Sequence, residues 1–357
     1  MILYIGIIII LILGGFTLKR KSYFLFSVLL LTFIAGLRHP SMGLGDIEKV
    51  YYPQYIQSKT MSFGDILSSI SSGTGYLLLM KIFTIARMPF QIFLFFNSAL
   101  FVVAAERMMY KYSKDYLISQ IIFMSSAYFF SFALIRQYMA MSILLFAFPY
   151  LFERKPIKYC ILVLLGALFH YTVLIALVLY PLVRFLRSGK MDVVIILIGL
   201  VFGILCPSIV LGFVKLLFPQ LYIYYNFGVY SKGEGVSWVW FLILMIPNLL
   251  YFVWYLLRKN GKKYSIGEVT SVEKDLLLVN CVGVSLFCFS SIIVEFYRVS
   301  QYFTIPYMIL LANLICMNRD KGFKTFAKII ILCMFIIYMY ASTLQNLSCA
   351  TYRFFWM

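Results

Sequence analysis

Two polar pairs interrupt a long apolar stretch of the sequence, Arg136-Gln137 and His170-Tyr171. A basic turn, Glu153 to Lys158, lies between them. If the apolar segments on either side of this turn both cross a membrane, the two polar pairs reach the same face, opposite the turn. An arginine in or beside hydrocarbon is costly, so it usually faces a cavity or a partner. Arg136 and His170 are therefore the first candidates for chemistry.

Other polar residues fall at or just beyond the ends of apolar segments on that predicted face, namely Arg38, Asp46 and Arg298. Several cations that converge on one face predict an anionic ligand. Diphosphate is the natural candidate, because arginine binds phosphate oxygens in a two-pronged fork. Tyrosines offer flat apolar faces with a polar tip, which suit sugar rings. They include Tyr51, Tyr52, Tyr55, Tyr222, Tyr224, Tyr225 and Tyr230. A lipid-linked sugar diphosphate would satisfy both features.

Each of these residues also has a purely structural interpretation. Tyrosines near helix ends commonly form the aromatic belt at the membrane interface. Arg298 could pair with Glu295, three residues earlier on one helix face. Arg38 could simply flank a membrane span, and His170 could be a structural histidine. The functional interpretation rests on the prediction that these residues all reach the same face of the membrane.

The composition places the chain among membrane proteins. Of 357 residues, 63% are hydrophobic and 12% are charged, and the mean hydropathy is +0.94. Soluble proteins are roughly half apolar and a quarter charged. The length predicts an all-α, polytopic helical bundle of about 12 transmembrane helices, as a single domain over residues 1–357. The net charge of +18 has a plain cause in cytoplasmic loops rich in Lys and Arg, and no nucleic-acid partner is expected.

The basic segments predict the topology. We expect the first helix, Ile2 to Leu18, to be retained, with the amino terminus outside the cell. The segments around residues 38–74 and 207–237 are expected to be external loops. Gly75 to Met88 is short for a span and carries Lys81 and Arg87, which favours a re-entrant helix on the outer side.

No motif for a metal ion or a nucleotide is present in the sequence. It contains no Asp-x-Asp, no His-x-x-x-His and no glycine-rich loop followed by lysine. None of the seven cysteines forms a C-x-x-C pair. We therefore expect no metal and no cofactor, and we interpret the cysteines as apolar packing residues.

Four pieces of the sequence resemble the EpsG family of bacterial polysaccharide polymerases, which is related to the Wzy-type O-antigen, capsule and exopolysaccharide polymerases. The pieces LIRQYMAMSILLFAFPYLFERKPIKY and LLGALFHYTVLIALVLYPL resemble the family's central Arg-Gln, basic turn and Phe-His. GLRHPSMGLGD resembles its early external motif, and EFYRVSQYF resembles its late arginine. Two features depart from the pattern: two residues, not one, separate Gly43 from Asp46, and no acidic residue precedes the glycine-aromatic pair in Ser72-Gly73-Thr74-Gly75-Tyr76.

The resemblance implies a metal-independent, GT-C-like glycosyltransferase on the outer face of the bacterial cytoplasmic membrane. Such an enzyme moves a growing glycan from undecaprenyl diphosphate onto a new lipid-linked repeat unit. It would bind the diphosphate with Arg136 and Arg298, supported by Arg38. His170 or Asp46 would accept the proton of the attacking hydroxyl.

The same resemblance implies that Gln137, Tyr51 and Tyr55 orient sugar, and that a chain-length regulator and a flippase are possible partners. Two other classes of function stay open. A flippase for lipid-linked oligosaccharides would be similarly basic but would show internal repeats and broken helices near the midplane. A membrane acyltransferase that modifies the glycan would need a histidine accessible to a cytoplasmic acyl donor.

Overall fold

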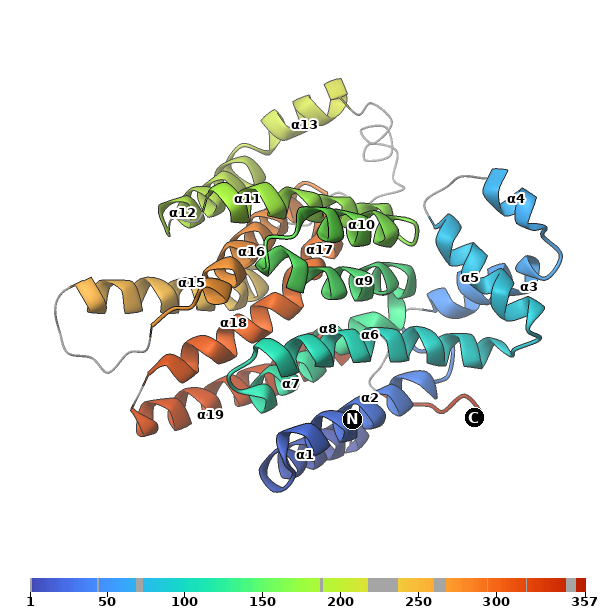
Figure 1. Ribbon diagram of the computed structural model, residues 1–357, viewed down its shortest axis with the longest axis horizontal. Helices are drawn as coiled ribbons and strands as arrows, with labels where there is room; N and C mark the ends of the chain where they lie inside the picture. Colours follow the sequence, from blue (N-terminus) through green and yellow to red (C-terminus); the bar gives the residue numbers. More distant parts are fainter. Residues whose placement is uncertain are drawn as a thin grey trace. The chain divides into compact units, whose positions relative to one another are not determined.

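The computed structural model describes residues 2–43, 45–68, 73–186, 189–217, 237–259, 268–293, 295–318, 320–344 and 351–357. These residues form helices and connecting segments without a β-strand, apart from one isolated bridge between Arg38 and Phe354 (Figure 1). The chain divides into two compact units, Met1–Leu177 with Thr325–Met357, and Val178–Lys324. The prediction of one integrated domain over residues 1–357 stays a prediction.

Six helices in the described part of the chain are long and apolar enough to cross a membrane. They are Phe90–Tyr112, Tyr116–Ala133, Ile135–Phe152, Trp238–Leu256, Glu295–Met317 and Lys321–Ala341. A bent pair, Asp192–Leu205 and Pro207–Phe213, adds a seventh if it is one span. The prediction of an all-α, polytopic membrane protein is confirmed. A count of twelve would also require shorter helices to cross.

The first unit is built on helices that pack side by side in chain order. Helix α2 (Arg20–Gly36) packs against α6 (Phe90–Tyr112), α6 packs against α9 (Ile135–Phe152), and α9 packs against α10 (Pro156–Ala167). Apart from the short helices between residues 47 and 85, the other described helical segments of this unit are α1 (Ile2–Thr17), α7 (Tyr116–Ser125), α8 (Ala127–Ala133), η2 (Tyr171–Val178), α19 (Lys321–Tyr338) and η6 (Met339–Leu344). Apolar side chains fill the contacts between these helices, because burial of apolar area stabilises the packing.

Helices α9 and α10 form a hairpin, and its turn is the predicted basic segment. Arg154 adopts a positive φ of 60° after α9 ends at Phe152. Pro156 then begins α10, because its fixed φ and missing N–H suit the first helical position. The hairpin therefore carries the basic turn at one end and the beginning of α9 at the other.

The segment predicted as an external loop, residues 38–74, folds largely into short helices. They are η1 (Ile47–Tyr51), α3 (Tyr52–Ser58) and α4 (Phe63–Ser68), followed by α5 (Thr74–Ile85). At 1.5 Å per residue, the 12 residues of α5 extend about 18 Å, well short of a hydrocarbon core of about 30 Å. This length fits the expected re-entrant helix better than a span.

A buried carboxyl group joins three helices of the first unit. Glu106 of α6 is fully buried and accepts hydrogen bonds from the Tyr116 hydroxyl and from Gln120 Nε2, the latter at 2.9 Å. Ser27 of α2 lies 3.5 Å from the same carboxylate. Glu106 is not among the residues predicted from the sequence, although an acidic residue inside an apolar segment is itself a signal.

The second unit surrounds α16 (Ser271–Cys288), which packs against helices before and after it in the chain. Its first turn carries a capping box in which Thr270 and Glu273 bond each other's backbone. The other segments are α11 (Leu179–Phe185), α12 (Gly189–Ile198), η3 (Gly199–Leu205), α13 (Pro207–Leu217), α15 (Trp238–Lys259), η4 (Phe289–Ser291), α17 (Glu295–Ser300), η5 (Gln301–Phe303) and α18 (Thr304–Met317). The predicted external loop at 207–237 begins as α13. The tyrosines Tyr222, Tyr224, Tyr225 and Tyr230 lie outside the described residues.

Candidate active site at the beginning of helix α9

Arg136 lies in the first turn of α9, directly after the break that separates α8 from α9 at Leu134. Its neighbours Ile135 and Met139 are buried and anchor this turn in an apolar cluster. The Arg136 guanidinium carbon lies 5.6 Å from the ring centroid of Tyr51, which is a cation–π distance. The first turn of α9 thus holds a cation over an aromatic platform.

Aromatic rings from four elements build this platform. Tyr51 of η1 lies edge-on to Tyr76 of α5, with 5.7 Å between centroids. Tyr76 in turn lies 5.3 Å from Phe93 of α6, and Tyr55 of α3 lies 5.5 Å from the same ring. Such edge-to-face and tilted pairs add to the stability that burial alone gives. The predicted external segment is therefore packed onto the membrane helices through its aromatic residues.

The beginning of α5 lies next to the beginning of α9 and the end of α10. A Cβ atom placed on Gly73 would come 3.0 Å from Nη1 of Arg136 and 3.9 Å from the carbonyl oxygen of Phe169. The Gly75 N–H donates a hydrogen bond to the carbonyl oxygen of Leu168 at 2.9 Å. These contacts bring Arg136 and the residue before His170 to one end of the hairpin.

His170 occupies the break between α10 and the 3₁₀ segment η2, where the sequence predicted a break between two short helices. Its side chain is half-buried. Its Nδ1 lies 2.6 Å from the Thr172 hydroxyl oxygen, and its ring stacks on Tyr171 at 5.8 Å. The contact with Thr172 orients the imidazole. Thr172 was not singled out from the sequence, although a hydroxyl two residues after a histidine is within reach of its ring.

Arg38 is deeply buried, with 1% of its surface exposed. Its Nη1 donates hydrogen bonds to the carbonyl oxygen of Ala35 and to Ser98 Oγ, the latter at 2.9 Å. Its guanidinium carbon lies 4.5 Å from the Phe132 ring centroid. A cavity of about 10 Å³, room for about one water, adjoins these groups. Arg38 thus ties α2, α6 and α8 together.

Two tyrosines of the platform have perturbed hydroxyl groups. Burial raises the pKa of the Tyr76 phenol well above its ordinary value, and the positive charges of Arg136 and Arg38 oppose that rise. Burial also raises the pKa of Tyr55, whose hydroxyl donates to the carbonyl oxygen of Met88 at 2.7 Å. The Tyr55 hydroxyl is therefore engaged with the backbone in this structure, while both arginines act on the same buried phenol.

The remaining predicted residues occupy varied positions. Gln137 follows Arg136 in α9 and is buried. Asp46 is partly exposed and directly precedes η1. Arg298 is exposed on α17 of the second unit, one turn after Glu295. The structure thus brings together Arg136, His170 and Tyr51 within the first unit and describes Arg298 only within the second.

Arg136 can bind an anion at the end of the hairpin where the backbone of Phe169, the residue before His170, also lies. Among the described residues, no group of three or more His, Cys, Asp or Glu side chains could hold a metal ion. A guanidinium offers several N–H donors in a fixed plane, and a neutral imidazole can accept a proton. The site is therefore suited to displacing an anionic leaving group by an oxygen nucleophile.

Comparisons with known proteins agree with the sequence resemblance. A model of the EpsG family matches residues 21–354, which is nearly the whole chain. No curated protein and no solved structure matches it.

Proposed function

Since the chain belongs to the EpsG family, whose members are like the Wzy-type polymerases, we propose that it is a bacterial polysaccharide polymerase. It transfers a glycan from undecaprenyl diphosphate onto a new lipid-linked repeat unit. The observation that carries this proposal is the placement of Arg136 and His170 at one end of the α9–α10 hairpin, opposite the basic turn.

The proposed reaction is a glycosyl transfer in one displacement. An acceptor hydroxyl oxygen forms a bond to the anomeric carbon of the donor glycan, and the bond from that carbon to the diphosphate oxygen breaks. His170 or Asp46 accepts the hydroxyl proton, and the lipid diphosphate leaves with the bonding electron pair. Negative charge grows on the leaving group, so a guanidinium already in place at Arg136 stabilises the transition state.

The other predicted residues take supporting roles in this proposal. Arg298 binds the diphosphate together with Arg136, and Arg38, buried among α2, α6 and α8, supports them. Gln137, Tyr51 and Tyr55 orient the sugars. A chain-length regulator and a flippase would act alongside the enzyme.

The proposed orientation follows from the distribution of basic residues. The turn that contains Arg154, Lys155 and Lys158 faces the cytoplasm, because cytoplasmic loops collect positive charge. Arg136 and His170 then face outward, in the bacterial cytoplasmic membrane. In this arrangement the short helices contribute to a GT-C-like bundle of about 12 spans.

The test uses a strain in which the chromosomal gene is deleted and the Arg136→Ala variant is expressed in its place. Polymer length is measured on a gel that resolves single repeat units. We expect loss of the ladder, with single units still transferred to the surface acceptor. Arg136→Lys keeps the charge without the two-pronged fork and should restore only short polymer. Lys21→Ala, which removes an exposed cation of α2, is the control and should leave the ladder intact.

Three outcomes would overturn the proposal. A normal ladder from correctly inserted Arg136→Ala protein would remove the central role of this arginine. In the strain without the gene, lipid-linked units accumulating on the cytoplasmic side would indicate a flippase. An unchanged ladder with altered acetyl content would indicate an acyltransferase.

A further inference from the structure

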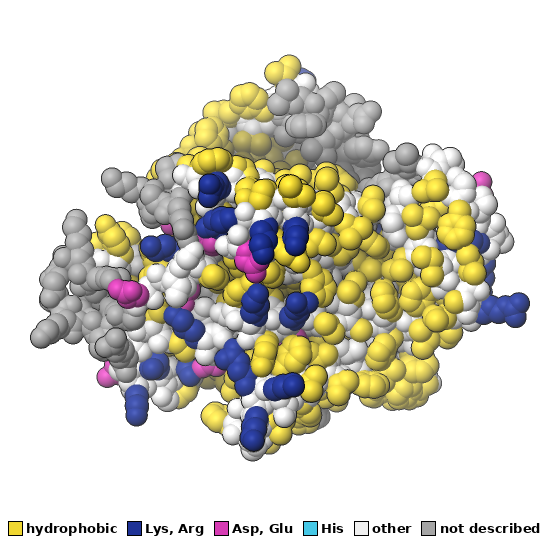
Figure 2. Space-filling view, viewed as in Figure 1, with side chains coloured by type: hydrophobic (Ala, Val, Ile, Leu, Met, Phe, Trp, Pro, Cys, Tyr) yellow, Lys and Arg dark blue, Asp and Glu magenta, His cyan; other side chains and the backbone are white. Residues whose placement is uncertain are grey.

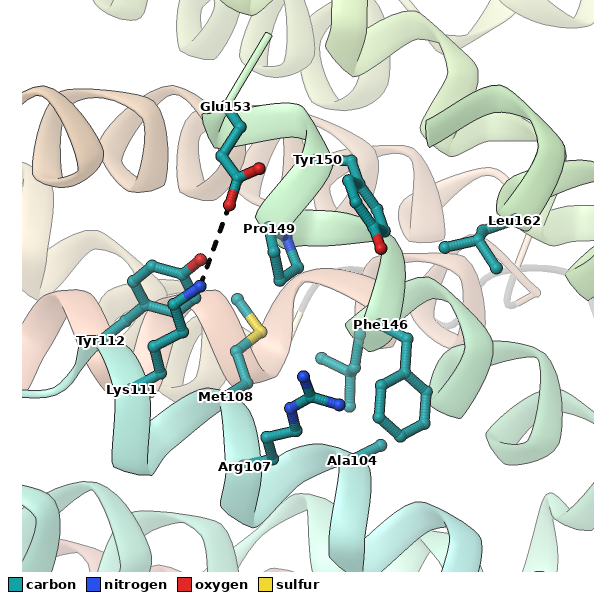
Figure 3. A pocket seen from close by; sticks show the side chains of 11 residues that line it. Ala104, Arg107, Met108, Lys111, Tyr112, Phe146, Pro149, Tyr150, Glu153 and Leu162 are labelled. Atoms are coloured by element: carbon teal, nitrogen blue, oxygen red, sulfur yellow. Dashed lines mark ion pairs between the residues drawn. The ribbon is translucent and has the colours of Figure 1, made fainter. Parts of the chain in front are cut away.

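A cavity of about 330 Å³ lies at the other end of α9, next to the basic turn (Figure 3). The last turns of α6 and α9 form most of its wall, and Leu162 of α10 closes one side. The α9 residues that line it, Leu145 to Tyr150, follow Arg136 by nine to fourteen positions, which is about 14–21 Å along the helix. It is therefore distinct from the candidate active site.

Positive charge lines the mouth of this cavity. Arg107 and Lys111 lie one turn apart on α6, and the Arg107 guanidinium points into the cavity (Figure 3). The guanidinium carbon lies 5.5 Å from the Phe146 ring centroid, which holds it beside an apolar wall. The neighbouring turn adds Arg154 and Lys155, and the first turn of α10 adds Lys158.

Among the described residues that line the cavity, Glu153 is the acidic one. Its carboxylate lies 2.7 Å from Lys155 Nζ and 4.0 Å from Lys111 Nζ. The hydrogen bond and the charge of Lys155 lower the pKa of Glu153, so this carboxylate stays ionised at neutral pH. Even with that charge counted, the cavity and its rim keep an excess of positive charge that suits an anion.

Exposed apolar surface continues from the cavity along two helices. On α10, Ile157 is 74% exposed and Ile161 is 58% exposed. On α6, exposed Phe96 and Val103 lead along the helix toward Arg107. Figure 2 shows Lys and Arg side chains gathered over the ends of α6, α9 and α10, with hydrophobic side chains beyond them. An occupant that combines an anionic head with hydrocarbon chains would match both surfaces.

We propose that this cavity binds the phosphate headgroup of an anionic phospholipid, whose acyl chains lie along the exposed faces of α6 and α10. Basic pockets between membrane helices on the cytoplasmic side recognise such headgroups. A free phosphate would need only the cations, whereas the adjoining apolar faces favour a lipid. The site does not depend on the proposed polymerase activity.

The test uses the purified full-length protein in detergent, titrated with phosphatidylglycerol or phosphatidylcholine of the same acyl chains. Native mass spectrometry measures bound lipid, and thermal unfolding measures stabilisation. The wild type should bind phosphatidylglycerol more tightly than phosphatidylcholine. The double variant Arg107→Gln/Lys111→Gln should weaken that binding about tenfold or more, since each cation near a lipid surface contributes to attraction.

The matched control is Lys19→Gln/Lys21→Gln. It removes the same number of exposed charges at the same end of the unit, where Arg20 of α2 bonds the Tyr110 carbonyl oxygen of α6 at 2.6 Å. The control should bind phosphatidylglycerol as the wild type does. An equal loss in both double variants would show general surface attraction and overturn the proposal.

Three further results would also overturn it. Equal binding of the two lipids would show that charge does not determine binding. The exposed apolar faces of α6 and α10 would then be assigned to contact with a protein partner. Stabilisation by inorganic phosphate as strong as that by phosphatidylglycerol would indicate a soluble anion. If the charge variant does not fold, Leu162→Trp decides, because it narrows the cavity without changing charge: weaker phosphatidylglycerol binding supports the proposal, and unchanged binding contradicts it.

Discussion

Gly73 lies directly against Arg136: a Cβ atom on Gly73 would come 3.0 Å from Nη1 of the arginine. The backbone of Gly73 has a φ of 111°, a conformation that residues with side chains rarely adopt. The position therefore needs glycine for two reasons, the turn before α5 and the space for the guanidinium. The beginning of α5 positions the cation of the candidate site.

Gly73→Ala should displace Arg136 and lower polymerisation without unfolding the protein. The added methyl group meets the tip of a flexible side chain, so the guanidinium moves more easily than the backbone. Misplacing a catalytic group by about 1 Å can cost about a hundredfold in rate. We expect a rate about ten- to a hundredfold lower, measured with purified enzyme in liposomes.

Gly45→Ala is the matched control for this variant. Gly45 also has a positive φ, 77°, but the nearest atom to its Cβ position is Cε of Lys49 at 3.7 Å. It shares the backbone strain without touching an arginine. Equal rate losses in the two alanine variants would show that strain, and not contact with Arg136, causes the effect.

The common end of Arg136 and His170 could be inferred from the sequence, because a hairpin of two apolar helices fixes which ends meet. A basic turn between two polar interruptions leaves one simple arrangement. The contact of Gly73 with Arg136 could not be inferred, since it joins residues far apart in the chain. The acidic residue missing before Gly75-Tyr76 marks this segment as a departure from the family pattern but does not predict that contact.

Composition and hydropathy were sufficient to predict an all-α membrane protein. They were not sufficient to predict the short helices in the segment at 38–74. Its short helices depend on tertiary packing of Tyr51 and Tyr55 against α5 and α6, and short helices have little stability by themselves. The burial of Arg38 could not be predicted from the sequence either. Its hydrogen bond to Ser98 and its contact with Phe132 come from distant parts of the chain.

Tyr51 allows the ring and the hydroxyl to be tested separately. Its ring lies under the Arg136 guanidinium, so Tyr51→Leu should remove the cation–π contact and lower the polymerisation rate about three- to tenfold. Tyr51→Phe keeps the ring. If the hydroxyl orients sugar as proposed, this variant should raise KM for the lipid-linked acceptor with little change in kcat. Steady-state kinetics at varied acceptor concentration measures both, and an unchanged KM would limit Tyr51 to supporting Arg136.

Tyr55→Phe should reduce stability. Tyr55 is buried and its hydroxyl donates to the carbonyl oxygen of the exposed Met88 at 2.7 Å, so the variant loses a part-buried hydrogen bond. Such a loss costs about 0.5–1.5 kcal/mol. Thermal unfolding in detergent should show a lower Tm. Wild-type stability would contradict the importance of the Met88 contact, and a loss of activity in folded protein would support the proposed contact with sugar.

Thr172→Val tests whether the orientation of His170 matters for proton transfer. The Thr172 hydroxyl lies 2.6 Å from Nδ1 of His170, and valine keeps the shape without the hydroxyl. If His170 is the general base, it must be neutral to accept a proton, so wild-type activity should fall as the pH falls. A ring held less firmly should lower kcat about tenfold, as general bases contribute about a hundredfold or more.

The pH–rate profile separates positioning from a purely structural role of Thr172. A positioning role predicts that Thr172→Val moves the acidic limb of the profile, because the hydroxyl contact biases one protonation state of the ring. Thr172→Ser retains the hydroxyl and should retain the wild-type limb. Asp46→Asn should leave the limb in place if His170 is the base. If the acidic limb persists in His170→Gln and disappears in Asp46→Asn, the carboxylate takes the proton and the contact with Thr172 is structural.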